Sequence, residues 1–372
     1  MTWRGWLMAG VGGIGALLAL AAGSVCLTGG CSSIGYLAQS AGGHLSLVAS
    51  ARPVPEWIES ADTAEPLKAR LALSQRMRDF AVSELKLPDN GSYRAYADLH
   101  RTAAVWNVAA APELSLKLET WCFPVVGCVG YRGYYDQQKA EAEGQALRDR
   151  GLEVTVYPVP AYSTLGKMNW LGGDPLLNTF IQWSEGQLAE LIFHELAHQV
   201  IFVPGDTMFN ESFATAVERL GGERWLEQHG SAQARAQAAV IDQRRSDFRA
   251  LTLRTRTALD EIYRSDAPDG VKRERKAALM AEMRAAYTAL KAGPWKGYSG
   301  YDGYFDKANN ASLGIQATYL DWVPAFGALF EREGRDFARF YAAAGRLVSL
   351  PRNERDAALQ ALAPAHPVTA TN

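Results

Sequence analysis

Cysteine is scarce in this chain, and neither sign of charge is in large excess. Four cysteines among 372 residues are too few for a disulfide-based scaffold, and they lack the paired spacing of a zinc ribbon. The 38 Lys and Arg residues nearly balance the 40 Asp and Glu residues, which leaves a net charge of −2. Because a nucleic-acid surface needs a basic excess to neutralise phosphates, we expect no nucleic-acid partner.

Hydrophobic residues are plentiful, at 48% of a chain long enough for one large or two modest domains. Helical spacing of apolar residues begins near residue 64 and dominates the second half of the chain. Period-two alternation predicts two or three strands between residues 92 and 121, and another strand at 152–159. The predicted helices cover 64–87, 136–150, 207–228, 232–263, 271–291, 311–330 with a kink at Pro324, and 335–347.

The first residues have the features of an export signal. Arg4 gives a short positive region, and the apolar stretch from Leu7 to Leu27 carries no charge. Its length also suits a retained transmembrane anchor, which is the alternative, although its glycines weaken such a helix. Small residues before Cys31 resemble a bacterial lipobox, so we predict lipidation of Cys31 and attachment to the lipid bilayer. Ser32 after that cysteine favours, by resemblance to Gram-negative lipoproteins, the outer membrane facing the periplasm.

The most informative stretch runs from Leu188 to Ala214. It opens with an apolar helical pattern that meets no Gly or Pro before Pro204. His194 and His198 are four residues apart and therefore lie on one helix face, where two imidazoles can bind one zinc ion. Glu195 lies beside His194 and can reach a zinc-bound water without binding the metal, which suits a general base.

A hydrolytic zinc site needs three protein ligands and one position open for water. Glu211 is the best candidate for the third ligand, because it follows the helix-breaking pair Pro204-Gly205 in a new helical pattern that can fold back against the first. A His-Glu-x-x-His motif that arose by chance would be part of a solvated helix. The helix here has strongly apolar surroundings, where burying two histidines and a glutamate without a partner would cost free energy. We therefore predict a zinc site formed by His194, His198 and Glu211.

The order of these motifs resembles the gluzincin metallopeptidases, in which His-Glu-x-x-His is followed by a glutamate on the next helix. The longer segments resemble a bacterial family called putative aminopeptidases: His194–Gln199, Asn210–Thr215, Gly30–Tyr36, Tyr162–Gly166 and Asn309–Ala311. This resemblance covers most of the chain. It implies an α+β fold with a thermolysin-like catalytic domain, a small N-terminal mixed sheet and a mainly α-helical C-terminal half.

The resemblance also implies where a peptide substrate binds. In gluzincins a strand before the zinc helix holds an extended peptide, a common mode of peptide recognition. By resemblance, this role falls to Tyr162, Ser163 and Thr164, and we expect further backbone contacts from Asn309 and Asn310. The Gly-x-Met-Glu-Asn strand of gluzincin aminopeptidases, whose glutamate binds the free N-terminus, has no counterpart here. Asp174 and Glu185 are nearby in sequence and can substitute for that glutamate.

Three further assignments concern the surroundings of the zinc site. Gluzincins commonly stabilise the oxyanion with a Tyr or His donor. The Gly- and Tyr-rich loop at 293–310 offers such donors, although plain packing is equally compatible with its tyrosines. Glu218 can orient a metal ligand or belong to a solvated face. The candidate oxyanion donors are Tyr301, Tyr304 and, on the next helix, Tyr319. Cys122 and Cys128 either form a disulfide or stay as two buried thiols.

We therefore predict a zinc-dependent metallopeptidase of the cell envelope, with aminopeptidase action expected and endopeptidase action open. The alternative is an envelope lipoprotein that binds a peptide or a protein partner through a structural or degenerate zinc site. The intact Glu195 favours the enzyme, since a structural site needs no base. The expected segments are a signal peptide at 1–30, an anchored segment at 31–62, the α+β peptidase core at 63–228, and a helical region at 229–372 that completes the cleft.

Overall fold

The computed structural model describes residues 31–123, 127–161, 163–166, 172–317 and 322–363. The chain divides into two compact units, residues 1–49 and 50–372. The first unit holds nearly all of α2 (Cys31–Ser50). The second unit contains every other element named below, so the two segments that we separated at residue 228 lie in one unit.

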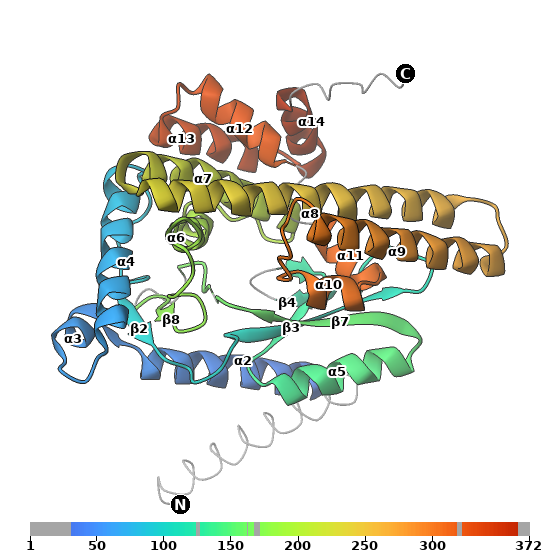
Figure 1. Cartoon of the computed structure of the whole chain (residues 1–372), viewed down its shortest axis with the longest axis horizontal. Coiled ribbons are helices and arrows are strands. Elements are labelled where there is room, and N and C mark those ends of the chain that lie inside the picture. Colours follow the sequence, from blue (N-terminus) through green and yellow to red (C-terminus); the bar gives the residue numbers. More distant parts are fainter. Residues whose placement is uncertain (1–30, 124–126, 162, 167–171, 318–321, 364–372) are drawn as a thin grey trace, which may run out of the picture. The chain divides into compact units, whose positions relative to one another are not determined.

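The described strands of the second unit form three small sheets (Figure 1). One sheet has the order β6-β3-β7, the second β1-β2-β8, and the third is the hairpin β4-β5. The strands are β1 (Arg52–Pro53), β2 (Ala95–Ala97), β3 (Val105–Pro112), β4 (Trp121–Phe123), β5 (Gly127–Val129), β6 (Arg132–Tyr134), β7 (Leu152–Val159) and β8 (Leu176–Leu177).

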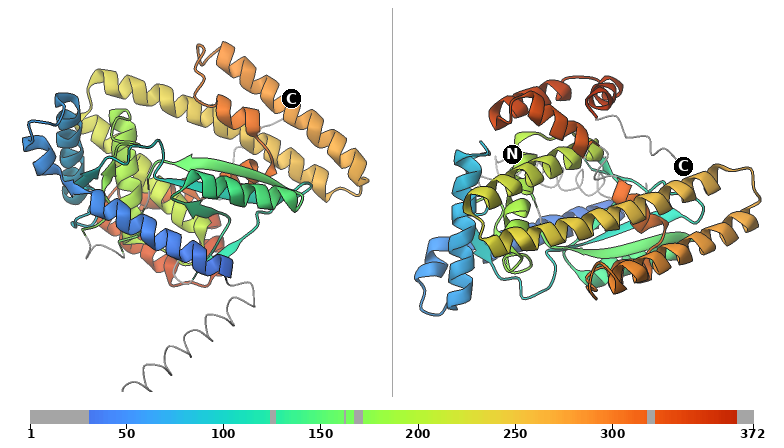
Figure 2. Two further views of the ribbon diagram at one scale, coloured as in Figure 1. Left: turned by 90° about the horizontal axis from the view of Figure 1, so that it is seen from below. Right: turned by 45° about the horizontal axis from the view of Figure 1, so that its top comes forward.

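Helices make up most of the unit, and the second half of the chain is helical as predicted. They are α3 (Val54–Glu59), α4 (Glu65–Ser83), α5 (Gln137–Asp149), α6 (Glu185–Val200), α7 (Thr207–His229), α8 (Ala232–Arg264), α9 (Asp269–Ala292), α10 (Asp302–Lys307), α11 (Asn310–Ala317), α12 (Val323–Arg332), α13 (Phe337–Val348) and α14 (Arg352–Leu362). Figure 2 shows α8 and α9 side by side as a long antiparallel hairpin.

Polar residues begin the three helices that matter most for the site. Ser184, Asp206 and Ser231 are the N-caps of α6, α7 and α8, and each side chain accepts a hydrogen bond from a backbone N–H in the first turn. Such caps satisfy donors that a helix leaves unpaired at its start, and each typically contributes about 1 kcal/mol. The local sequence therefore fixes where these helices begin.

Helix α7 is enclosed by other helices (Figure 1). Its partner α6 makes the most extensive helix–helix contact of the chain. A Cβ added at Gly221 would lie 3.0 Å from Phe193 of α6, so the missing side chain allows this close approach. On another side, Phe209 and Phe213 pack edge-on against Phe326 of α12, with ring centroids 5.3 and 5.6 Å apart. This packing holds α7 at a fixed distance from α6.

The longest sheet pairing runs between β3 and β7, antiparallel from Val105 opposite Val159 to Pro112 opposite Leu152. Alternate residues of β7 face opposite sides. A Cβ added at Gly144 of α5 would lie 2.9 Å from Val156 and 3.5 Å from Val154, so the even-numbered residues face that helix. The odd-numbered residues face away from α5, and Glu153 among them contacts Lys276 of α9 and the backbone of Asn310 of α11.

The α+β class is confirmed, and two local predictions are wrong. Residues 114–120 form no strand although their polarity alternates, and β4 begins only at Trp121. The helix predicted over 311–330 is interrupted, because α12 begins at Val323 with Trp322 as its N-cap, while residues 318–321 lie outside the described residues. Pro324 lies in the first turn of α12, where its missing N–H needs no partner, so it starts a helix rather than bending one.

Among the described residues, no helix is both long and apolar enough to cross a bilayer. The expected signal at residues 1–30 lies outside the described residues, as does the side chain of Cys31. The lipid anchor and the envelope location therefore stay predictions.

Candidate metal centre

Two neighbouring helices bring the three expected zinc ligands together. His194 and His198 lie one turn apart on α6, with ring centroids separated by 4.9 Å, and Glu211 faces them from α7. One donor atom from each residue lies within 4.8 Å of the other two. Glu211 Oε2 is 3.4 Å from His194 Nε2, and Glu211 Oε1 is 3.7 Å from His198 Nε2. Donors on a tetrahedral zinc ion lie about 3.3–3.5 Å apart, so this spacing suits the metal.

A second carboxylate of α7 orients the first histidine. His194 Nδ1 lies 2.8 Å from Glu218 Oε2, seven residues beyond Glu211. Two turns separate these glutamates, which places both on the helix face that meets α6. The carboxylate of Glu218 accepts the Nδ1 proton, and this leaves the Nε2 lone pair of His194 for a metal.

The charges at the ligand set are unbalanced without a cation. Burial alone would lower the pKa of His194, but hydrogen bonds to Glu211 and Glu218 raise it well above the ordinary value. Burial lowers the pKa of His198 to about 4, so this imidazole is neutral at physiological pH. His198 Nδ1 is buried and has no hydrogen-bond partner in the described part of the chain. Two imidazoles and one carboxylate with these properties fit a zinc ion.

Glu195 projects beside the ligands and does not join them. Burial raises the pKa of Glu195 to about 7. His194 lowers this pKa, whereas Glu211 and Asp174 raise it further. A hydrogen bond from the Ser163 side chain favours its ionised form. A carboxylate with a pKa near 7 exchanges protons readily at physiological pH, which suits an acid–base catalyst.

A cavity of about 190 Å³ adjoins the ligand set. It is walled by the end of β7 and the chain that follows it, by α6 and α7, and by one residue of α8. The lining residues are Val159, Pro160, Ala161, Trp183, Gln187, Glu190, Leu191, His194, Glu195, Glu218 and Arg245. The cavity therefore places apolar surface and several carboxylates next to the donors that can hold a metal.

The pair Glu190–Arg245 in this wall was not anticipated from sequence. Arg245 Nη1 on α8 donates to Glu190 Oε2 on α6 over 2.7 Å. Burial raises the pKa of Glu190 to about 7, although Arg245 opposes this shift. No sequence signal could have paired them, because the two residues are 55 positions apart on helices whose packing was unknown.

The segment expected to hold a peptide lies against the base. The backbone N–H of Thr164 donates to both carboxylate oxygens of Asp174, over 3.1 and 3.0 Å, while Ser163 contacts Glu195. Tyr162 lies outside the described residues. Asp174 is thus used to hold this segment. Glu185 is the other residue suggested to bind a free N-terminus. Its carboxylate accepts a hydrogen bond from the indole of Trp225.

Tyr301 and Tyr304 lie in an aromatic cluster on α8 and α10. The ring of Tyr301 stacks on Phe248 with centroids 4.6 Å apart, and Tyr304 meets the same ring edge-on at 4.8 Å. Burial raises the pKa of Tyr301, while Arg245 and Arg249 lower it, and no metal ligand contributes. Both tyrosines thus pack against Phe248, and the oxyanion role expected of them stays a prediction. Tyr319, the third candidate, lies outside the described residues.

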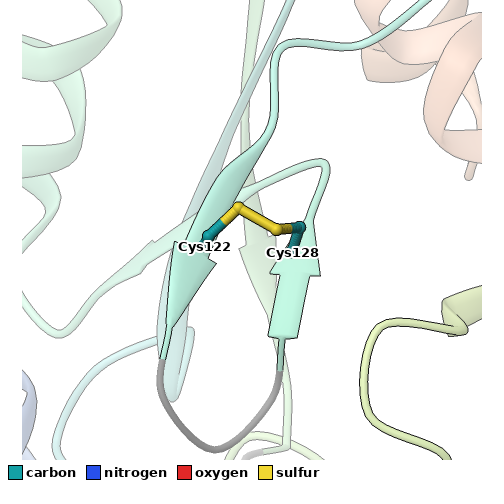
Figure 3. The surroundings of a disulfide bond; sticks show 2 residues. All are labelled: Cys122 and Cys128. Atoms are coloured by element: carbon teal, nitrogen blue, oxygen red, sulfur yellow. A yellow bond between two sulfur atoms is a disulfide. The ribbon is translucent and has the colours of Figure 1, made fainter.

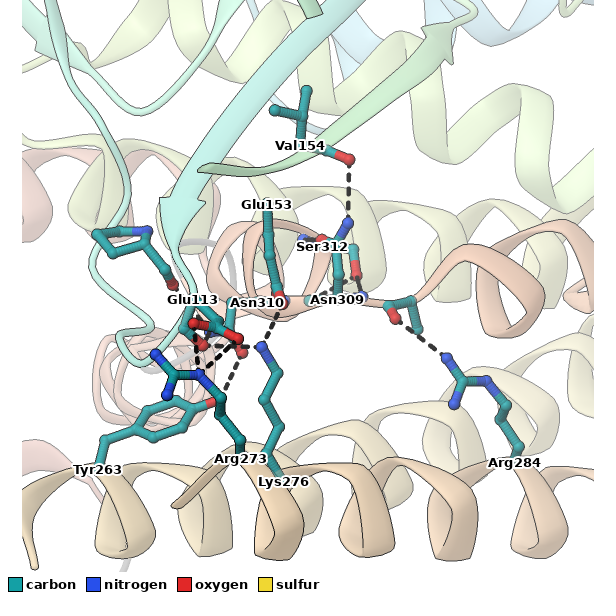
Figure 4. Close-up of polar contacts among 12 residues, drawn as sticks. Glu113, Glu153, Val154, Tyr263, Arg273, Lys276, Arg284, Asn309, Asn310 and Ser312 are labelled. Atoms are coloured by element: carbon teal, nitrogen blue, oxygen red, sulfur yellow. Dashed lines mark hydrogen bonds and ion pairs between the residues drawn. The ribbon is translucent and has the colours of Figure 1, made fainter. Parts of the chain in front are cut away.

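Asn309 and Asn310 also have internal partners in place of the expected substrate (Figure 4). Asn309 Nδ2 donates to the carbonyl oxygen of Val154 over 3.0 Å. Asn310 is fully buried; its Nδ2 donates to the carbonyl oxygen of Pro112 over 3.0 Å, and its Oδ1 accepts from Tyr263 over 2.8 Å. These bonds tie the start of α11 to the ends of β3 and β7, and the expected contact of both asparagines with substrate stays a prediction.

Cys122 and Cys128 form a disulfide in the structure (Figure 3). They occupy opposite positions of the antiparallel pair β4–β5. The bond closes a short loop and links two strands that have no other sheet partner among the described residues. It holds this hairpin together and contributes no metal ligand.

Carboxylates of the candidate site raise the pKa of two tyrosines that the sequence analysis passed over. Burial raises the pKa of Tyr93 strongly, and Glu195 adds to this effect. Burial and Glu211 both raise the pKa of Tyr157, against the hydrogen bond from Asn107.

Comparison with known proteins gives one match. A family model described as a putative aminopeptidase covers residues 35–359, which include α6, α7 and the cavity wall. No curated protein and no solved structure matches the chain.

Proposed function

The chain belongs to the putative aminopeptidase family, and from this premise we propose that it is a zinc-dependent metallopeptidase with a gluzincin-like core. The family supports peptide hydrolysis in general terms. The observation that carries the zinc assignment is the convergence of His194, His198 and Glu211, with donor atoms within 4.8 Å of one another. This donor set on consecutive helices is the kind that catalytic zinc sites use.

In this proposal the chain's own residues hold the metal and move one proton. His194 Nε2, His198 Nε2 and a carboxylate oxygen of Glu211 bind zinc, and Glu218 keeps His194 in the binding tautomer. When bound, zinc supplies a Lewis acid that lowers the pKa of water and polarises a carbonyl. Glu195 takes a proton from the attacking water and returns it to the leaving amine nitrogen. Ser163 donates to Glu195 and holds its carboxylate in place.

We further propose that the substrates are peptides of the cell envelope. The export signal and the lipidation motif at Cys31 support this location. The family description supports action at a free N-terminus. Asp174 and Glu185, the residues first suggested to bind that terminus, are engaged with Thr164 and Trp225, so exopeptidase action rests on the family alone.

Metal analysis combined with an unbiased peptide library tests the proposal. The purified protein should contain one zinc per chain and cleave library peptides in a reaction that a chelator abolishes and zinc restores. Each peptide is supplied with a free and with a blocked N-terminus. Cleavage of free peptides alone supports aminopeptidase action, and cleavage of blocked peptides identifies an endopeptidase. Zinc without any cleavage would instead favour a peptide-binding lipoprotein with a non-catalytic site.

A further inference from the structure

We propose that Arg245 and Arg249 of α8 bind a carboxylate of the substrate, so that the cavity beside the candidate metal centre selects peptides with an acidic group close to the scissile bond. The carboxylate is either the free C-terminus of a short peptide or the side chain of an aspartate or glutamate. This inference rests on the proposed peptidase function and adds a substrate class to it. The two arginines only hold the peptide, and no bond is made or broken by them.

Arg245 faces the cavity with part of its guanidinium free. The residue lines the cavity together with His194 and Glu195. Its Nη1 donates to Glu190 Oε2 over 2.7 Å, and its side chain stays 30% exposed. In the described part of the chain, neither Nε nor Nη2 of Arg245 has a hydrogen-bond partner. Glu190 therefore holds the guanidinium in place, while its other donors stay available to a ligand.

Arg249 extends this site by one turn of α8. It follows Arg245 by four residues, so the two side chains lie on the same helix face, with Cβ atoms about 5–6 Å apart. Arg249 is partly buried, yet its guanidinium makes no hydrogen bond and no ion pair with any described residue. Burial lowers the pKa of Arg249, whereas Tyr301 and Glu218 raise it. The effect of Glu218, a residue of the cavity wall, agrees with the position that the helix geometry gives Arg249.

The positive charges of this wall exceed the carboxylates that can neutralise them. Glu190 is paired with Arg245, and Glu218 is engaged with a ligand histidine. Asp242 lies 3.6 Å from Arg245, but its side chain is 61% exposed, so solvent screens its charge. Arg249 has no such partner, and a partly buried charge without a partner costs free energy. A carboxylate ligand would supply that partner and match the planar fork of an arginine.

The size of the cavity limits the ligand to a small part of a peptide. Its volume of about 190 Å³ is below the ~300–1,000 Å³ that is typical of drug-sized ligands, so it holds roughly one residue. Apolar side chains such as Val159, Pro160 and Leu191 line it together with the charged groups. His194 and Glu195 line the same cavity, so a carboxylate bound there belongs to a residue close to the scissile bond.

A library of short peptides in three forms tests the inference with the zinc-loaded protein. Each peptide is supplied with a free C-terminus, as a C-terminal amide, and as an amide with glutamate in place of one residue. Wild type should cleave a carboxylate-bearing form with a KM about 10–100-fold below that of the plain amide, as expected for hydrogen bonds to a charged group. Preference for the free C-terminus identifies the terminal carboxylate, and preference for the glutamate form identifies a side chain.

Arg249→Met is the main variant, because methionine keeps an apolar stem and Arg249 has no internal polar partner to lose. It should raise the KM for the preferred form by a similar factor, leave kcat nearly unchanged and have no effect on the plain amide. The double variant Glu190→Gln with Arg245→Met should do the same, since it leaves neither member of the pair charged and alone. Arg254→Met, at an exposed arginine of the same helix, is the control. Zinc content and melting temperature of Arg249→Met should match wild type.

Each contrary result has a distinct meaning. An active wild type that cleaves all three forms equally well would overturn the carboxylate site and leave the peptidase intact. So would a carboxylate preference that survives in Arg249→Met, because other residues would then bind the acidic group. Loss of folded structure in Arg249→Met, or an equal rise in KM for every form, would assign Arg249 to the scaffold and likewise overturn its role. A zinc-loaded wild type that cleaves no peptide would overturn the peptidase function itself, and the substrate class with it.

Discussion

Glu195 is the residue on which the proposed chemistry depends most directly. Its glutamine variant, Glu195→Gln, keeps the shape of the side chain and removes the proton acceptor. Because Glu195 is not a ligand, we expect zinc content to stay at the wild-type level. Loss of a general base typically lowers the rate about 10²–10⁴-fold, and turnover of a library-selected peptide measures this. Cleavage at the wild-type rate would refute the assignment.

In the proposed zinc site, Glu218 would act on the metal through His194. Replacing it by alanine removes the acceptor 2.8 Å from His194 Nδ1, so the imidazole is free to turn and to change tautomer. Loss of such a partner typically weakens metal binding about 10–100-fold, which competition with a zinc indicator measures. Glu223→Ala is the matched control, since Glu223 is an exposed glutamate of the same helix. Equal zinc affinity in both variants would show that Glu218 is dispensable.

The convergence of His194, His198 and Glu211 could be predicted from sequence because its geometry is local. Two histidines four apart share a face on any helix, and a glutamate on the following helix needs only one turn of chain to reach them. The pair Glu190–Arg245 in the cavity wall could not be found in this way, because it depends on how α8 packs against α6, between residues 55 positions apart.

At the scale of elements, the approach of α7 to α6 sets the distance from Glu211 to the histidines. A Cβ at Gly221 would lie 2.7 Å from Leu85 and 3.0 Å from Phe193, closer than packed atoms tolerate. We expect Gly221→Ala to destabilise the chain by about 1–3 kcal/mol and to weaken zinc binding, because α7 must move away from α6. Denaturant unfolding and indicator competition measure the two effects.

Gly345→Ala is the control for that variant, since a Cβ at this position of α13 meets nothing within 4 Å. Relief of the helix-disfavouring glycine should raise stability by up to about 1 kcal/mol and leave zinc affinity unchanged. If Gly221→Ala behaved in the same way, the close contact between α6 and α7 would not be what positions Glu211.

The elements that were predicted correctly are those whose own sequence determines them. Helix α6 has a capping serine, an apolar stripe and no breaker before Pro204. Other features depend on partners far away in the sequence. Residues 114–120 alternate like a strand but form none in the structure, and Asn309 and Asn310 bind carbonyl groups of β7 and β3 more than 150 positions away. Alternation and loop composition carry no information about such distant partners.

At the scale of the whole molecule, the cavity joins segments that the sequence separates widely. Val159 and Pro160 come from the end of the sheet, His194 and Glu218 from the metal-binding helices, and Arg245 from α8. The expected boundary at residue 228 therefore falls between two parts of one cavity wall. A helical region that completes the cleft was anticipated, but the residue that it contributes was not.

Metal binding should stabilise this whole unit, because the ligands converge only when α6 and α7 are packed. An ion that binds the folded chain alone raises the free energy of unfolding by RT ln(1 + [Zn]/Kd), about 4 kcal/mol at a concentration 1,000 times Kd. We therefore expect chelation to lower the melting temperature of wild type by several degrees and added zinc to restore it. His198→Ala removes one ligand and should no longer respond to either treatment. A response as large as in wild type would place the stabilising ion at a different site.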